Sequence, residues 1–590
     1  MTAFLIHNIA PLMFGTLFLT LLLGYPVAFS LAAVGLGFGL VGIELGLLSP
    51  ALFQALPERV WGVMANDTLL AIPFFTFMGL ILERSGMAED LLDTIGQLFG
   101  PVRGGLAFAV VLVGALLAAT TGVVAASVIS MGLISLPIML RYGYDRRLAT
   151  GVIAASGTLA QIIPPSLVLI VMADQLGRSV GDMYAGAFIP GAILTSLYLG
   201  YVVLVTQISP GRAPALPLEA RTIREPDGGS GVTSLLILLG LAIAAALTFE
   251  WFYYQAAAPL DTKIVVTTSV GMGLAFALAG ANRLLGLRLL SKMAERVTFV
   301  LIPPLALVFL VLGTIFLGVA TPTEGGAMGA TGALAMALAR RRLSLKLLRQ
   351  AMDSTTKLSA FVLFILIGAR VFSLTFYGVN GHVWVEDLLA GLPGGELGFL
   401  IVVNLLVFVL AFFLDFFELA FIIVPLLGPV ADKLGIDLVW FGILLAVNMQ
   451  TSFMHPPFGF ALFYLRSVAP ARAYLDKLTG RRMAPITTGQ IYWGAIPFVV
   501  IQIIMVSLVI AFPQMVMVYK GQREAVDPNQ VEIVLPPMQA PTLAPRDDLG
   551  SAFGAGPAPE HAEGSSDRTT DAPSSEPTGT PPDDLTDLFR

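Results

Sequence analysis

Long apolar runs, separated by short polar segments, occupy most of the first 513 residues of the chain. A run of about twenty apolar residues can cross the hydrocarbon core of a bilayer as a helix. Twelve runs have this character, near residues 5–23, 26–48, 66–84, 148–173, 186–208, 232–250, 264–281, 297–318, 322–340, 355–376, 437–465 and 488–513. The pattern therefore predicts an all-α polytopic membrane protein with about twelve transmembrane helices.

Two further apolar stretches, 104–141 and 397–430, are too long for a single crossing. Polar residues lie near the middle of each: Thr120, Thr121 and Gly122 in the first, and Asp415 and Glu418 in the second. We expect both stretches to form re-entrant hairpins whose tips stop inside the membrane.

The spanning runs 148–173 and 437–465 contain the double prolines Pro164-Pro165 and Pro456-Pro457. Proline removes a backbone donor and clashes with the preceding helical turn, at roughly 3 kcal/mol or more. In lipid, the unpaired groups of a broken helix are tolerated only inside protein or beside a wet cavity. Two broken helices in corresponding halves indicate a midplane site of a transporter, whereas ordinary proline kinks are the alternative.

An internal repeat relates the two double prolines. Each series opens with an acidic Glu-Asp-Leu-Leu segment and continues through a glycine-rich turn, a hairpin, a proline, an aspartate and the proline pair. The separation from Glu89 to Pro164 is 75 positions, and that from Glu386 to Pro456 is 70. The matching order predicts two structurally related units.

The basic residues predict the orientation, because short cytoplasmic loops collect Lys and Arg. Five loops are basic: those with Arg141, Arg146 and Arg147; with Arg212, Arg221 and Arg224; with Arg283, Arg288, Lys292 and Arg296; with Arg340 to Arg342; and with Arg466, Arg472, Lys477, Arg481 and Arg482. All five can be cytoplasmic at once with the predicted spans, and the two repeats are then inverted. Both chain ends are then outside.

Composition agrees with this reading: 56% of residues are hydrophobic and 12% are charged, where soluble proteins carry about 25% charged residues. The net charge of −6 argues neither for nucleic acid nor for anionic lipid, and we expect no nucleic-acid partner. With no cysteine, thiolate chemistry is excluded, and the four scattered histidines offer no zinc spacing. Residues 522–590 form an acidic, Pro-rich tail that we expect to be disordered.

Oxygen-bearing residues gather around the breaks and hairpin tips. The predicted sodium ligands are Thr120, Thr121, Gly122, Ser156, Gly157, Thr158, Asp415, Asn448, Thr451 and Ser452. Helix N-termini can receive an anion there, and carbonyl and hydroxyl oxygens suit Na⁺ better than a transition metal. The alternative is that small hydroxyl residues hold the helices together.

Ionisable residues inside predicted spans are costly and therefore functional candidates. Arg370 could pair with Asp415 or Glu418 for structure, or its guanidinium could clamp a substrate carboxylate. We favour the clamp because two acids are available and only one arginine. Glu324 could be a helix-start carboxylate. His455 is a candidate substrate contact or a core histidine. With Arg370, the predicted substrate contacts are Ser166, His455, Phe416 and Gly459.

Several segments together resemble one family. They are Ile72-Pro73-Phe74-Phe75, Ala125 to Pro137, Gly157-Thr158-Leu159, Ile163-Pro164-Pro165-Ser166, Ala320-Thr321-Pro322-Thr323-Glu324, Phe413-Leu414-Asp415, Phe441-Gly442-Ile443 and Pro456-Pro457-Phe458-Gly459. Over about residues 5–513 the chain resembles the large membrane subunit of tripartite ATP-independent periplasmic (TRAP) transporters.

The resemblance implies an elevator-type secondary transporter of the ion transporter superfamily in a bacterial inner membrane. It also implies Na⁺ coupling, a small four-helix membrane subunit, and a periplasmic substrate-binding protein that delivers an organic acid. His455 stands where many members carry Thr, and Phe416-Phe417-Glu418 replaces small residues at a hairpin tip. These bulky residues favour a small monocarboxylate or keto acid, with a dicarboxylate still open.

The resemblance also suggests a division of the chain. The expected parts are scaffold helices 1–85, transport unit 1 at 86–173, a connecting helix at 174–208, an inserted helical pair at 209–296, scaffold helices 297–385, transport unit 2 at 386–466, a final helix at 467–521 and the tail 522–590.

Three hypotheses follow. The first is Na⁺-driven, binding-protein-dependent uptake of a carboxylate, with no cofactor; no Walker A pattern is present. The second is a secondary anion transporter that needs no binding protein. The third is an intramembrane enzyme, which the missing catalytic motifs and the symmetric repeat disfavour.

Overall fold

The computed structural model of the protein describes residues 2–520, apart from residues 123, 224, 226–228, 230, 254–259 and 477–478. Within these residues the regular structure is helical except for two short strands, β1 (Tyr474–Leu475) and β2 (Arg482–Met483). The strands pair antiparallel, with Tyr474 opposite Met483. The expected all-α architecture is confirmed, whereas the tail from residue 522 lies outside the described residues.

Two series of elements follow the same order along the chain. The first is α5 (Met87–Phe99), α6 (Gly105–Thr121), α7 (Val124–Arg141), α8 (Arg146–Thr158), the 3-10 turn η2 (Leu159–Gln161) and α9 (Leu167–Leu176). The second is α16 (Gly381–Ala390), α17 (Gly395–Leu410), α18 (Phe416–Ile422), α19 (Val424–Lys433), α20 (Leu438–Met449), η5 (Gln450–Phe453) and α21 (Phe460–Val468). Each hairpin starts after a glycine with a left-handed backbone, Gly104 at φ 79° and Gly394 at φ 97°, a conformation that favours glycine.

Further helices surround the two series. They are α1 (Thr2–Leu22), α2 (Val27–Glu44), η1 (Pro50–Ala55), α3 (Leu56–Met64), α4 (Ala71–Arg84), α10 (Val180–Ile208), η3 (Pro210–Arg212), η4 (Leu218–Ala220), α11 (Val232–Tyr253), α12 (Leu260–Leu285), α13 (Lys292–Phe316), α14 (Pro322–Ala339), α15 (Leu345–Gly378), α22 (Thr488–Ala511) and α23 (Gln514–Met517).

Nine of the described helices are long and apolar enough to cross a membrane: α1, α2, α7, α10, α11, α12, α13, α15 and α22. The predicted crossing at 66–84 contains the 14-residue helix α4, and 322–340 forms α14. The runs 148–173 and 437–465 are each divided into two shorter helices on either side of their double prolines. The chain is therefore a multi-pass helical membrane protein.

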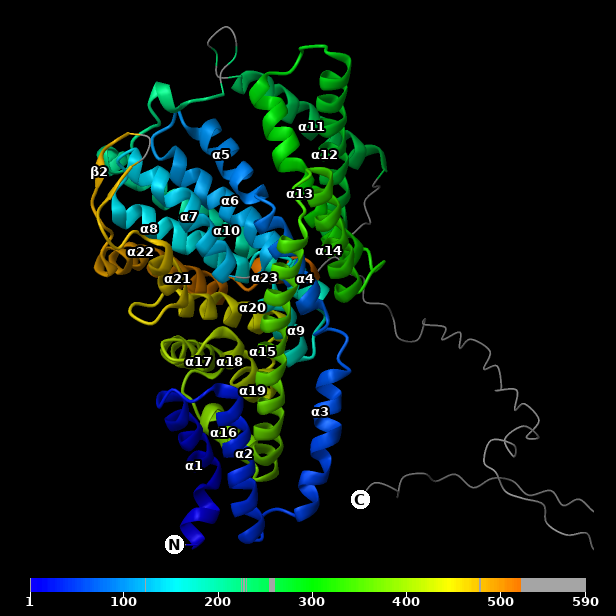
Figure 1. The fold of residues 1–590 in the computed structure, drawn as a ribbon. Coiled ribbons are helices and arrows are strands. Elements are labelled where there is room, and N and C mark those ends of the chain that lie inside the picture. Colours follow the sequence, from blue (N-terminus) through cyan, green and yellow to red (C-terminus); the bar gives the residue numbers. More distant parts are fainter. Residues whose placement is uncertain are drawn as a thin grey trace, which may run out of the picture. The chain divides into compact units, whose positions relative to one another are not determined.

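The long helix α15 runs beside α2 and also contacts α3 and α4, and α14 packs on α4 (Figure 1). The inserted helices α11 and α12 pack on each other, and α12 packs on α13. Both broken helices lie in the buried interior: every residue of α8 from Leu148 to Thr158 and every residue of α20 is buried. The helix breaks therefore sit where their backbone is enclosed by protein.

Candidate functional site

The first broken helix starts and restarts at side-chain caps. Asp145 accepts hydrogen bonds from the backbone N–H groups of Arg147 (2.9 Å) and Leu148 (3.0 Å), which starts α8. After η2 and Pro164-Pro165, the Ser166 hydroxyl accepts from Val168 N–H (3.2 Å) and donates to the Gln161 carbonyl (2.5 Å). Such caps replace intrahelical partners that the terminal N–H groups lack, so the chain can re-enter a helix within the buried core.

The second broken helix follows the same scheme with a different restart. Asp437 accepts from Val439 N–H (2.8 Å) and Trp440 N–H (3.1 Å) at the start of α20. After η5 and Pro456-Pro457, α21 starts at Gly459, which provides no side-chain cap. The Gly459 N–H donates to the His455 carbonyl at 2.6 Å, so the backbone itself closes this turn.

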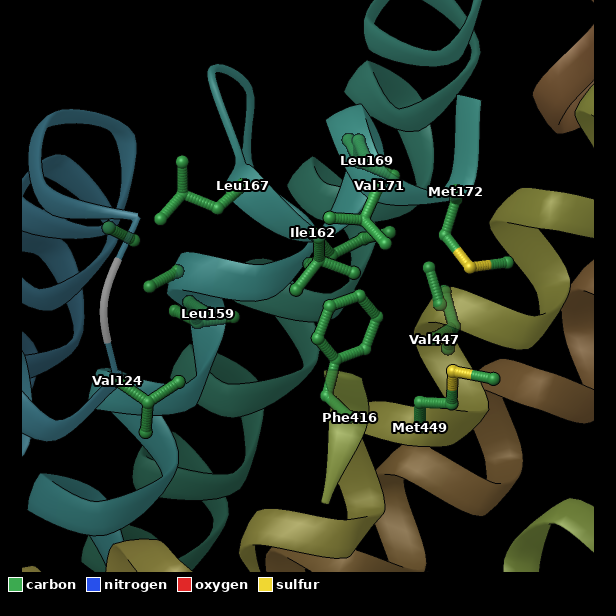
Figure 2. Packing of buried hydrophobic residues seen from close by; sticks show 14 of the residues in the cluster. Val124, Leu159, Ile162, Leu167, Leu169, Val171, Met172, Phe416, Val447 and Met449 are labelled. Atoms are coloured by element: carbon green, nitrogen blue, oxygen red, sulfur yellow. The ribbon is translucent and has the colours of Figure 1, made fainter. Parts of the chain in front are cut away.

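A direct hydrogen bond joins the two breaks. The Gln450 side-chain Nε2 in η5 donates to Thr158 Oγ1 at the end of α8, at 3.1 Å. Buried apolar side chains pack between the same elements: Figure 2 shows Phe416 of the second hairpin near Ile162 and Met449, with Leu159 and Val124 farther along. The structure therefore brings the two breaks of the predicted repeat together in one buried region.

The hydroxyl groups predicted to bind sodium are deeply buried and bonded to their own helices. Ser156 donates to Val152 O (2.6 Å), Thr158 to Ala155 O (2.8 Å), Thr451 to Asn448 O (2.6 Å) and Ser452 to Met449 O (2.7 Å). Each hydroxyl proton is thus used, while the oxygen keeps acceptor capacity. The Asn448 amide donates to Asn404 O (2.7 Å) and Oδ1 (3.0 Å).

Two glutamines add acceptor oxygens that the set of sodium ligands predicted from sequence omits. The Oε1 atoms of Gln161 and Gln450 are buried and have no hydrogen-bond partner among the described residues. A buried amide oxygen without a partner costs free energy, and amide and hydroxyl oxygens are ligands that hard cations accept. The oxygen donors at the breaks therefore fit Na⁺, and Gln161 and Gln450 lie in the corresponding turns η2 and η5.

The first hairpin meets the first break at its tip. Gly122 ends α6 with a left-handed backbone (φ 58°), and a Cβ atom there would lie 3.1 Å from Leu167 Cγ. Gly157 is similarly close-packed, since a Cβ atom would lie 2.3 Å from Val128 Cγ2. The side chains of Thr120 and Thr121 lie outside the described part of the structure.

The two acids of the second hairpin cap a helix. Glu418 N–H donates to Asp415 Oδ1 (2.9 Å), and Asp415 N–H donates to Glu418 Oε2 (2.8 Å), forming a capping box at the start of α18. Within the described residues neither acid forms an ion pair with Arg370. The capping-box spacing of acid, two residues and acid was visible in the sequence and was the signal for this role. Thr321 and Glu324 form the same motif at α14, as the helix-start interpretation of Glu324 expected.

His455 lies among aromatic rings. Its ring stacks on Phe412 (centroids 4.3 Å, 18°) and meets the edge of Phe408 (4.3 Å, 72°). It is 1% exposed, and neither ring nitrogen has a hydrogen-bond partner within the described residues. His455 thus occupies an apolar environment next to the second proline pair, and its Nδ1 and Nε2 atoms have no hydrogen-bond partner within the described residues.

The predicted substrate residues fall into two places. Ser166, His455 and Gly459 flank the breaks, and Phe416 is buried beside them. Arg370 instead lines a cavity of about 470 Å³ formed by η1, α3, α9, α15, α18 and α19, and none of the other four residues lines that cavity. The site residues stay predictions, and Arg370 lies apart from the other four in this respect.

Comparison with known proteins identifies the family. The model of the tripartite ATP-independent periplasmic transporter, DctM component, matches residues 14–515. A C4-dicarboxylate TRAP transporter large permease protein DctM from Pseudomonas aeruginosa is 28% identical over 436 residues, covering 73% of this chain and 84% of that protein. An isethionate TRAP transporter permease protein DctMQ from Oleidesulfovibrio alaskensis is 23% identical, covering 78% of this chain and 61% of that protein.

A solved structure, the YdaH transporter of Alcanivorax borkumensis, aligns with a TM-score of 0.45 at 15% identity, over 80% of this chain and 88% of that one. The family match spans both hairpins and both broken helices. The matched relatives are bacterial transporter permeases and not enzymes. This multi-pass bacterial inner-membrane protein belongs to the DctM family, the large permease subunits of tripartite ATP-independent periplasmic transporters.

Proposed function

We propose that the chain is the large permease subunit of a Na⁺-coupled, binding-protein-dependent secondary transporter that imports a small organic acid. The observation that carries the proposal is the contact between the two broken helices, through Gln450 and Thr158, inside a chain of the DctM family. Broken helices in corresponding halves are typical of transporter binding sites, because their free backbone groups can hold both an ion and an anionic substrate.

Sodium is proposed to bind at the breaks. The predicted ligands Ser156, Gly157, Thr158, Asn448, Thr451 and Ser452 lie in or beside η2 and η5, with Asp415 and the first hairpin tip as further candidates. The unpartnered amide oxygens of Gln161 and Gln450 support this assignment. When bound, Na⁺ supplies a positive charge whose inward movement gains about 2.3 kcal/mol per 100 mV of membrane potential.

The substrate carboxylate is proposed to contact this chain at Ser166, His455, Phe416 and Gly459, with Arg370 as a further clamp. Support comes from α9, whose N-terminus begins directly after Ser166 inside the core; a helix N-terminus favours an anion. Phe412 and Phe408 around His455 suit a partly apolar small acid. A monocarboxylate or keto acid remains our preference, although relatives are named for C4-dicarboxylate, isethionate and sialic acid.

Transport is proposed to follow an elevator mechanism, in which residues 86–173 and 386–466 slide as one body against a scaffold made from residues 1–85 and 297–385. The buried inter-repeat contacts support a single moving body, since Gln450 donates to Thr158 and α18 packs on α9. The remaining helices would surround the moving units and the scaffold. They are the inserted pair within 209–296 and the helices within 174–208 and 467–521.

The partners are proposed to be a small four-helix membrane subunit and a periplasmic substrate-binding protein. The relative named DctMQ, of which the match covers 61%, supports a small subunit as partner. Co-transport of more Na⁺ than the substrate has negative charges would make uptake electrogenic.

Proteoliposomes test the proposal. The complete complex with its binding protein should accumulate a labelled organic acid only under an inward Na⁺ gradient, and an inside-negative potential should increase the rate. Uptake that ignores the Na⁺ gradient would overturn the coupling. Uptake by this chain alone would overturn the requirement for partners and support a self-sufficient transporter.

A further inference from the structure

The cavity beside Arg370 contains a second arginine that the set of substrate residues predicted from sequence omits. Arg59 of α3 and Arg370 of α15 both line this space of about 470 Å³, a volume within the range of roughly 300–1,000 Å³ typical of small-ligand pockets. Ser373 and Gln175 add polar groups, while Phe421 and Pro425 add apolar walls. Arg59 and Tyr377, at the edge of the cavity, are exposed, so the cavity opens to the surface.

The positive charge in this cavity has no internal counterion. Neither arginine forms an ion pair or hydrogen bond within the described residues, and no Asp or Glu is among the residues that line the cavity. The neighbouring acid Asp174 is hydrogen-bonded instead by Asn66 Nδ2 (2.6 Å) and Gln175 Nε2 (2.7 Å). Two guanidinium groups in one concave space form a strong receptor for a carboxylate, because each offers a fork of donors.

The cavity lies on the boundary between the two proposed bodies. Arg59 and Arg370 come from helices assigned to the scaffold, whereas Phe421 and Pro425 come from α18 and α19 of transport unit 2. Tyr377 on the scaffold side donates a hydrogen bond to the Pro425 carbonyl across this boundary (3.3 Å). A ligand held by the arginines would therefore contact both bodies at once.

The cavity also faces the outer side. Arg370 is in the last part of α15, far along the helix from the basic Arg340–Arg342 segment that precedes it. Figure 1 shows the end of α15 together with α2, α3 and α16, away from the first hairpin and its basic loops around α7 and α8. Because basic loops are cytoplasmic, the cavity is on the periplasmic half.

We propose that this cavity is an entry site, in which Arg59 and Arg370 bind the carboxylate of an organic anion before it reaches the breaks. The proposal rests on the proposed function and adds to it a separate station on the substrate path. Because the arginines belong to the scaffold, they can hold the anion only until the transport units move. Arg370 is thus a first contact, and Arg59 shares its role.

The cysteine-free sequence provides a clean test. The Ser373→Cys variant of the full chain is reconstituted in liposomes. Its new thiol is then labelled from outside with a methanethiosulfonate reagent that carries either a negatively charged ethylsulfonate or a positively charged trimethylammonium group. Ser49→Cys, at an exposed serine between α2 and η1 that does not line the cavity, is the matched control. We expect the anionic-to-cationic rate ratio to be about tenfold higher at Ser373→Cys than at the control.

Occupancy is tested with the same variant. Succinate or pyruvate should slow labelling of Ser373→Cys, whereas succinamide at equal ionic strength should not. Adding Arg59→Gln should weaken the protection about tenfold, while Arg59→Lys should weaken it less because the charge remains. Protection by the periplasmic binding protein but by no free carboxylate would overturn the entry site and identify a docking socket for an acidic side chain of that protein.

The two proposals fail separately. A preparation that shows Na⁺-driven uptake, but in which carboxylates never protect Ser373→Cys, overturns the entry site and leaves the proposed function intact. A preparation in which carboxylates protect, but no Na⁺ gradient drives uptake, overturns the proposed Na⁺ coupling and leaves the entry site intact.

Discussion

The two broken helices share a plan and differ in how they are completed. In both, an aspartate starts the first half, a short 3-10 turn precedes a double proline, and a second helix follows. The first restarts at a Ser166 hydroxyl cap, whereas the second restarts at Gly459 beside a histidine held between phenylalanines. The prolines and the caps thus set the common geometry, and the flanking residues give each break its own chemistry.

The two broken helices also differ in how their first halves, α8 and α20, pack against their neighbours. In α8, a Cβ atom on Gly151 would lie 2.1 Å from the Gly494 carbonyl oxygen of α22, so the two backbones touch. In α20, a Cβ atom on Gly442 would meet the ends of two side chains, Met183 Cε at 2.6 Å and Leu176 Cδ1 at 2.7 Å. Small residues allow membrane helices to approach this closely, and only the first repeat depends on direct backbone contact here.

The largest effect should come from adding one methyl group at these glycines. Gly151→Ala must push α8 away from α22, and overpacking of this kind costs about 1–3 kcal/mol. Gly442→Ala should be near neutral, because flexible side-chain ends can move and alanine favours the helix by up to about 1 kcal/mol. Thermal unfolding of the purified protein in detergent measures both changes.

Equal losses in the two variants would contradict the proposed difference in packing. Gly240→Ala in α11, where no atom lies within 4 Å of the added Cβ, is the control for the effect of alanine alone.

Local signals explain which parts of this comparison were predictable. Double prolines, capping aspartates and apolar runs act within a few residues, so the breaks and the order of the repeat followed from the sequence. Contacts between distant segments, such as Gln450 with Thr158 or Gly151 with Gly494, could not be predicted from the sequence. Arg59 was missed because nothing in the sequence places α3 beside α15. Asp415 and Glu418 were interpreted as possible partners of Arg370, and Asp415 as a sodium ligand, although their spacing matched a capping box.

The second prediction concerns the restart of the first break. Ser166→Ala removes the acceptor for Val168 N–H and the donor to the Gln161 carbonyl. Loss of a helix cap costs about 0.5–2 kcal/mol, so the unfolding temperature should fall measurably. Ser467→Ala on the exposed side of α21 is the control, since its hydroxyl bonds only Tyr464 O of its own helix. If both alanine variants unfold alike, the cap does not hold the first break.

The third prediction tests the equivalence of the two aspartate caps. Asp145→Ala and Asp437→Ala should each cost about 1 kcal/mol, because each removes two hydrogen bonds to backbone N–H groups. Asp437 also pairs with Lys520, so its variant should lose slightly more. Lys520→Gln should account for that excess, which is at most about 1 kcal/mol for an exposed pair. An excess that persists in the Lys520→Gln background would show that the two caps are not equivalent.

An ion pair also joins the first transport unit to the segment that leads into α22. Arg141 at the end of α7 donates through Nη2 (2.9 Å) and Nε (3.1 Å) to Asp476, in the segment that leads into α22. Asp476 accepts as well from the Thr479 hydroxyl (2.6 Å) and backbone N–H (3.0 Å). The hydrogen bonds from Arg141 hold the pKa of Asp476 well below the usual range of an aspartate.

The smallest predicted effect concerns pH: we expect the stabilisation by Asp476 not to change between about pH 5 and pH 8. A lowered folded-state pKa means that the stabilisation is complete above the ordinary aspartate pKa of about 4, and is lost only as the pH falls well below it. The difference in unfolding temperature between the unmodified protein and Asp476→Asn should therefore stay constant from about pH 5 to pH 8. Asp93→Asn, which removes a more exposed pair with Arg296, should show a smaller difference over the same range. A difference for Asp476→Asn that shrinks toward pH 5 would mean that this ion pair titrates in mild acid, and that α7 loses its link to the segment before α22 there.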